Sequence, residues 1–236
     1  MAGFFSSPFL VFSSAIALRI ILFFYGLWQD ANSPMKYTDI DPHKTAFIFE
    51  LDNVLYPEKD YLFQAYYLFA GYLEYLDLID EKEAVNLMVD TFNEKGKDAV
   101  FAAVQEKYSL NDNYHIHFNF LMATAKLPLK LLLYQNMLEL MQDIIVDRKK
   151  LFIVTNGNPE MQLNKIKQTE WHGLEKYLVC YFADEVVAKP EPDVIHNILQ
   201  DHNLQRRNIV MIGNSDNDTL CAEAVGVDYI NVEQFL

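Results

Sequence analysis

The stretch that decides the fold is TAFIFELDNVLYP, residues 45–57, where a short apolar run meets two carboxylates. The run from Thr45 to Leu51 is typical of a strand that is buried on both faces of a sheet. Glu50 and Asp52 stand at its carboxyl end with one residue between them, so on an extended segment both side chains point the same way. A single carboxylate in such a place is more often a helix cap or a solvated charge, so the rest of the chain has to decide its meaning.

Downstream, four further strand-like runs alternate with helical segments. Strands are expected at 150–155, 179–182, 208–212 and 229–232, and helices at 135–146, from 158 onward, at 192–203 and at 218–225. This alternation predicts an α/β fold, a doubly wound parallel sheet of Rossmann-like type with helices on both faces. Such sheets bind ligands at the carboxyl ends of their strands, so the residues that follow each strand are where chemistry is expected.

Between residues 58 and 127 the hydrophobic pattern is helical throughout. It predicts an inserted all-helical cap at 58–127, between core segments 35–57 and 128–236. Six tyrosines between 56 and 75 offer faces for a flat substrate group, although their helical spacing favours packing among the cap's own helices. His115 and His117 lie two apart without a third ligand nearby, which favours cap surface over a metal site.

The apolar segment 1–34 differs from the rest, because 3–28 is almost wholly apolar apart from serines and Arg19. A bilayer span takes about 20 apolar residues, although an arginine near the middle costs roughly 2.5–3.5 kcal/mol on insertion. A signal peptide is disfavoured because no Lys or Arg precedes the apolar run. We expect first an extension that is not part of the natural protein, and second a membrane anchor.

Composition limits the partners and the compartment. The formal net charge of −14 over 236 residues disfavours nucleic acid and anionic membrane surfaces as partners. Cys180 and Cys221 have no ligand-type spacing, so neither a zinc site nor a disulfide framework is expected. A cytoplasmic protein is predicted, or a membrane-anchored one if residues 3–28 are an anchor.

Polar residues follow the other strands as well. Thr155 and Asn156 follow the second strand, Lys189 precedes the helix at 192–203, and GNSDND at 213–218 follows the fourth strand. Each is a weak indication alone. Together, two carboxylates, a hydroxyl, a lysine and a second acidic loop at one sheet edge suit phosphoryl transfer. A carboxylate attacks phosphorus or holds Mg²⁺, while the hydroxyl and the lysine cradle the phosphate oxygens.

These segments resemble, in order and spacing, the four motifs of the haloacid dehalogenase-like hydrolase superfamily. The similar segments are FELDNVLYP at 49–57, TNG at 155–157, KPEPD at 189–193 and GNSDND at 213–218. The resemblance covers residues 45–232, and the helical insertion corresponds to the family's cap. It implies a Mg²⁺-dependent phosphatase acting on a small phosphorylated metabolite. Residues 52–57 also resemble the opening of pyrimidine 5′-nucleotidases, which makes a nucleoside monophosphate one candidate.

The resemblance implies a role for each matching residue. Glu50 stands at the position of the nucleophile and Asp52 at that of the general acid–base. Thr155 and Lys189 would bind the transferring phosphate, with Asn156 orienting it. The implied Mg²⁺ ligands are Glu50, Asp52, Asn214 and Asp218.

Two positions depart from the family's pattern, because Glu50 and Asn214 both stand where aspartates are usual. Glu50 carries its carboxylate farther out, and a misplacement of about 1 Å can cost about 10²-fold in rate. Asn214 keeps a carbonyl oxygen but removes one formal charge, which weakens a site for a hard cation. Three functions stay open: an active phosphatase, which we favour, a catalytically silent binder of a phosphorylated ligand, and a membrane-tethered interaction scaffold.

Overall fold

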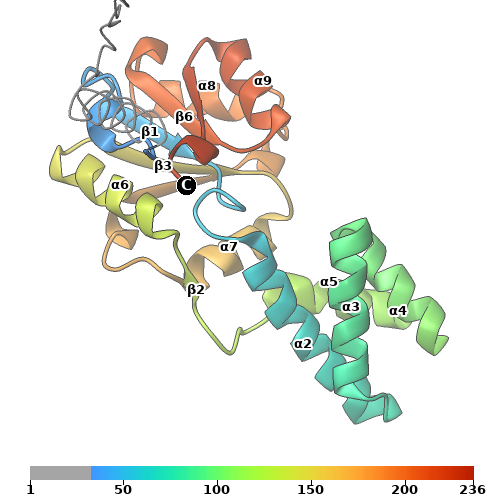
Figure 1. Ribbon diagram of the computed structural model, residues 1–236. Coiled ribbons are helices and arrows are strands. Elements are labelled where there is room, and N and C mark those ends of the chain that lie inside the picture. The colour runs from blue at the N-terminus through green and yellow to red at the C-terminus, as the bar shows by residue number, and fades with distance from the viewer. Residues whose placement is uncertain (1–32) are drawn as a thin grey trace, which may run out of the picture. The chain divides into compact units, whose positions relative to one another are not determined.

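A computed structural model describes residues 33–236 of the chain (Figure 1). The apolar stretch at 3–28, with the hypotheses of an anchor and of an extension, lies outside the described residues. Within residues 33–236, none of the helices combines the length and the apolar character that a membrane span needs.

The centre of the fold is a five-stranded parallel sheet. Its strands are β1 (Ala46–Phe49), β3 (Lys150–Thr155), β5 (Leu178–Phe182), β6 (Ile209–Gly213) and β7 (Asp228–Asn231). Their order is β5-β3-β1-β6-β7, and every neighbouring pair is parallel. All four residues of the central strand β1 are buried, which explains why this run has no polar alternation. The predicted doubly wound sheet is confirmed.

Helices cover both faces of this sheet. They are α6 (Gln135–Val146), α7 (Pro159–Gln168), α8 (Asp193–Asp201) and α9 (Asp216–Val225). Helices α8 and α9 lie on one face, and α6 and α7 lie on the other (Figure 1). Ile198 of α8 and Ala222 of α9 belong to the buried cluster that also holds Ile48 of β1 and Phe152 of β3.

Local sequence explains where these helices begin and end. Asn158 caps α7 by accepting a hydrogen bond from the backbone N of Met161 at 3.1 Å, and a proline fills the first helical position. Ser215 and Asp218 form a reciprocal capping box at the start of α9. The helix ends at Gly226, whose φ of 75° suits glycine. Because Ser215 is the cap, α9 begins two residues before the predicted start at 218.

The chain from 58 to 124 is helical, as its periodicity predicts. The helices are α2 (Glu58–Asp77), α3 (Glu81–Lys95), α4 (Val100–Tyr108) and α5 (Asn113–Thr124), with the short 3-10 helix η2 (Lys97–Ala99) between α3 and α4. The Tyr61 hydroxyl donates to the carbonyl of Met122 at 2.6 Å, which joins α2 to α5. The rings of Phe69 and Phe118 meet edge to face at 5.0 Å.

The tyrosines and histidines of this insertion have mixed surroundings. Tyr56, Tyr61 and Tyr66 are buried, as expected of packing residues, whereas Tyr67 and Tyr75 are exposed. The two histidines lie on α5 and so are not on an extended segment. Their rings contact those of Phe101 and Tyr72, respectively.

One element was not predicted. Strands β2 (Leu131–Leu132) and β4 (Thr169–Glu170) pair in a small parallel sheet. Two residues are too few to show the alternation by which strands are predicted.

Candidate functional site

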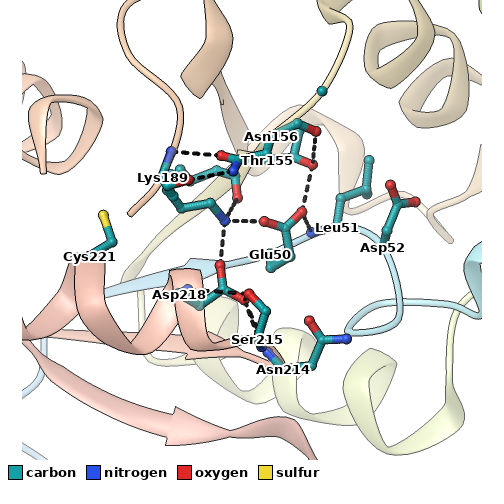
Figure 2. Close-up of polar contacts among 12 residues, drawn as sticks. Glu50, Leu51, Asp52, Thr155, Asn156, Lys189, Asn214, Ser215, Asp218 and Cys221 are labelled. Atoms are coloured by element: carbon teal, nitrogen blue, oxygen red, sulfur yellow. Dashed lines mark hydrogen bonds and ion pairs between the residues drawn. The ribbon is translucent and has the colours of Figure 1, made fainter. Parts of the chain in front are cut away.

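The carboxyl ends of β1, β3 and β6 bring together four of the predicted side chains. Glu50 follows β1, Thr155 ends β3, Lys189 lies in the loop before α8, and Asp218 lies in the first turn of α9 (Figure 2). All four are buried, with Glu50 8% exposed and the others less. Residues spread over 168 positions of sequence, from 50 to 218, thus form one polar cluster at the sheet edge.

Three donors converge on the Glu50 carboxylate. The Thr155 hydroxyl and the backbone N of Leu51 donate to Oε1 at 2.6 and 2.9 Å, and Lys189 Nζ donates to Oε2. We call these three donors the anion cradle. Burial raises the pKa of the Glu50 carboxyl, although the positive charge of Lys189 opposes this rise. A hydroxyl, an amide and an ammonium aimed at one point form a site for an anionic group of either carboxylate or phosphoryl type.

Lys189 is held on all sides. Its Nζ also donates to Asp218 Oδ1 at 2.5 Å and to the carbonyl of Val154 at 3.1 Å. Burial lowers the pKa of this ammonium, but the charges of Glu50 and Asp218 outweigh burial and raise it. The Asn156 amide grips the backbone of Lys189, accepting from its N at 3.0 Å and donating to its O at 2.9 Å. The family resemblance places Asn156 against phosphate, but here both polar atoms of its amide hold the lysine instead.

Asp52 takes a different set of partners from Glu50. Its Oδ2 accepts from Lys165 Nζ at 2.6 Å and from Gln162 Nε2 at 3.0 Å, and its Oδ1 accepts from the Tyr56 hydroxyl at 3.1 Å. Gln162 Nε2 also donates to Thr155 Oγ1 at 2.6 Å. The two carboxylates are therefore joined through Gln162 and Thr155 and share no donor.

Sequence reasoning missed Gln162 and Lys165. Both are fully buried on α7, three residues apart, so they face the same side of the helix. The usual interpretation of a lone lysine or glutamine in a polar helix is a solvated side chain. No pattern in the sequence contradicts that interpretation, because their partners lie more than 100 positions upstream.

Comparison with known proteins decides the family. Residues 47–232, most of the chain, match the family described as haloacid dehalogenase-like hydrolase. The chain belongs to the haloacid dehalogenase-like hydrolase family. The resemblance that the four motifs carry is therefore confirmed.

Solved structures with this hydrolase fold agree in architecture. A hydrolase of the family from Deinococcus radiodurans, crystallised with bound phosphate and sodium, has a TM-score of 0.52 at 18% identity, covering 81% of each chain. The UTR4 protein of Saccharomyces cerevisiae has a TM-score of 0.51 at 17% identity, covering 79% of this chain and 89% of that one. At such identities the similarity shows the fold alone.

A second kind of match concerns a short segment. The chain is 68% identical over 37 residues to GPI mannosyltransferase 1 of Neurospora crassa, and 61% identical over 41 residues to that of Aspergillus fumigatus. These segments are 16% and 17% of this chain. The chain spans only 8% and 10% of those two proteins.

Mg²⁺ is the metal that the family implies, and the donor set can be tested for it. All six oxygens of Glu50, Asp52 and Asp218 already accept hydrogen bonds from protein donors. Asn214 is exposed, and its backbone N donates to Asp218 Oδ2 at 3.2 Å. Within residues 33–236, no three His, Cys, Asp or Glu side chains gather as metal ligands. The predicted ligands therefore do not fit Mg²⁺ in this arrangement, since a hard cation would have to displace Lys189 or the loop amides.

A cavity of about 370 Å³ lies near the cluster. Its lining comes from α2, η2, α5 and the first turn of α7, and includes Leu62, Tyr66, Lys97, Phe118, Met122 and Met161. The rings of Tyr66 and Phe118 are stacked, with an interplanar angle of 16°. Met161 directly precedes Gln162, which contacts Asp52 and Thr155, so α7 connects the cavity to the anion cradle.

Gly213 controls how closely β6 approaches α9. A Cβ at this position would lie 2.6 Å from the Cβ of Asp218, which is below any real contact distance. We expect Gly213→Ala to destabilise the fold by about 1–3 kcal/mol through overpacking, measured by urea unfolding. Gly71→Ala on α2 is the matched control, because its Cβ would meet only the flexible end of Glu81 at 3.3 Å. Equal stability of both variants would contradict this account of the turn.

Proposed function

We propose that this chain hydrolyses a small phosphomonoester, with the phosphoryl group bound by Thr155, Lys189 and the backbone N of Leu51. The observation that carries the proposal is the convergence of these three donors on one anionic group. Carboxylate and phosphoryl oxygens attract the same donors, and charge-assisted hydrogen bonds from an ammonium are strong. In this proposal the Glu50 carboxylate occupies the anion cradle until a phosphoryl group displaces it.

The chemical steps follow from the positions of the two carboxylates. A Glu50 oxygen attacks phosphorus, a P–O bond to Glu50 forms, and the bond to the leaving alcohol breaks. Asp52 gives a proton to the departing oxygen. Water then attacks phosphorus, its proton goes to Asp52, and inorganic phosphate leaves as the Glu50 carboxylate is released. Thr155 and Lys189 hold the phosphoryl oxygens in both steps.

The cavity lined by Tyr66 and Phe118 is the proposed place for the rest of the substrate. Its volume is in the range of small-molecule sites, about 300–1,000 Å³. Stacked rings and methionines favour a flat, weakly polar group. A nucleoside monophosphate is one candidate of that shape.

Binding without turnover is the second candidate function. It is favoured by two departures at the reacting centre, the longer side chain of Glu50 and the neutral side chain of Asn214. Neither departure removes a donor of the anion cradle, so affinity for a phosphoryl group would survive the loss of hydrolysis.

Two measurements on the full chain separate these functions. Hydrolysis of p-nitrophenyl phosphate is followed with and without Mg²⁺, and binding of inorganic phosphate is followed by calorimetry. We expect turnover above that of Glu50→Gln, which keeps the shape of the side chain but cannot attack. Phosphate binding without turnover would support the second candidate. Neither binding nor turnover would refute both.

A further inference from the structure

Lys165 is an unusual residue for its position. It lies outside the four motifs, and no part of it is exposed. Its Nζ is 2.6 Å from Asp52 Oδ2, 3.7 Å from Glu58 Oε1 and 5.3 Å from the centre of the Tyr61 ring. Taking an ammonium fully out of water costs several kcal/mol, so a lysine is rarely buried unless its partners need it.

The contacts of Lys165 fix the direction of the Asp52 carboxylate. Lys165 and Gln162 are three apart on α7, and both donate to the same oxygen, Oδ2. The other oxygen, Oδ1, accepts only from the Tyr56 hydroxyl, at 3.1 Å. The Asp52 side chain is still 16% exposed, so a reacting group can reach it. One oxygen is thus anchored, and the other is the freer of the two.

Lys165 also connects this carboxylate to the helical insertion. Glu58 is the first residue of α2, and its Oε1 lies near Lys165 while accepting from Lys97 Nζ at 2.6 Å. Without the charge of Lys165, the carboxylates of Asp52 and Glu58 would share one largely buried region with a single partly exposed ammonium.

We propose that Lys165 is a positioning residue that anchors Oδ2 of Asp52 and leaves Oδ1 to exchange the proton with the leaving group. The inference rests on the hydrolysis proposed above. Lys165 itself neither gives nor takes a proton. Its effect is confined to the step in which Asp52 protonates the departing oxygen as the bond to phosphorus breaks. A leaving group that departs as a stable anion needs no such proton, whereas an alkoxide does.

The test compares two substrates that differ in this need. The kcat of Lys165→Met is measured on ethyl phosphate and on p-nitrophenyl phosphate, in the full chain and in the Glu50→Asp, Asn214→Asp background. We expect kcat to fall by about 10²-fold or more on ethyl phosphate, the usual size of general acid catalysis, and much less on the nitrophenyl ester. Lys165→Arg should recover part of the loss on ethyl phosphate, because a guanidinium can hold the same oxygen.

Controls separate positioning from folding. Lys167→Met makes the same change at an exposed position of α7 and should leave both rates unchanged. If Lys165→Met unfolds, adding Glu58→Gln removes the unpaired carboxylate, and the comparison is repeated in that protein. An equal loss on both substrates would overturn the role of Lys165 and leave hydrolysis standing. No turnover by either background, with phosphate still bound, would overturn hydrolysis and this role with it.

Discussion

Glu50→Asp combined with Asn214→Asp is expected to raise the turnover of p-nitrophenyl phosphate by about 10²-fold or more over the native chain. The shorter side chain at 50 withdraws the carboxylate from Thr155 and Lys189, so the phosphoryl group can take those donors. A misplacement of about 1 Å costs a factor of this size. The aspartate at 214 restores a charge for a hard cation, so the gain should depend on added Mg²⁺.

Single variants divide this gain between its two causes. Because both changes act on the same transition state, the double variant should exceed the product of the single effects. Glu50→Gln with Asn214→Asp is the control, since it restores the charge at 214 without a nucleophile, and it should stay inactive. Turnover equal to that of the native chain in the double variant would mean that neither departure limits the reaction.

Lys189→Met is expected to destabilise the fold by about 3–5 kcal/mol, the usual cost of leaving a buried charge without its partner. Lys189 is 3% exposed and contacts both Glu50 and Asp218, so its loss leaves two buried carboxylates side by side. Urea unfolding followed by circular dichroism measures the change.

A second variant identifies the cause of this loss. Lys189→Met combined with Glu50→Gln removes one of the two carboxylates and should recover part of the stability. Lys59→Met, at an exposed position of α2, is the matched control and should stay within about 0.5 kcal/mol of the native chain. A loss no larger at 189 than at 59 would show that the buried ion pairs do not hold this edge of the sheet together.

Much of this site could be predicted because each part of it follows a strand. Glu50, Thr155 and Asp218 lie at carboxyl ends of parallel strands, or in the helical turn that follows, and such ends share one edge of the sheet. Their convergence follows once alternating strands and helices indicate the sheet. The helical insertion was equally readable, since its periodicity spans several turns in each helix.

Other contacts left no trace in the sequence. Asn156 was expected to face phosphate, yet its amide grips the Lys189 backbone, a contact over 33 positions. Strands β2 and β4 are too short for any periodicity. Side-chain direction, unlike strand order, depends on which donors happen to lie within about 3 Å.

The sequence by itself determined the parallel sheet, the helical insertion and the family, because these follow from hydrophobic periodicity and from motifs in a set order. Only the tertiary structure decided the partners of the two carboxylates. It placed Glu50 in the anion cradle of Thr155 and Lys189, and it paired Asp52 with Lys165 across 113 positions of chain. The physical reason is burial: a lysine that would be solvated on an isolated helix becomes fully buried when α7 packs beside the sheet edge, and its charge must then find a carboxylate.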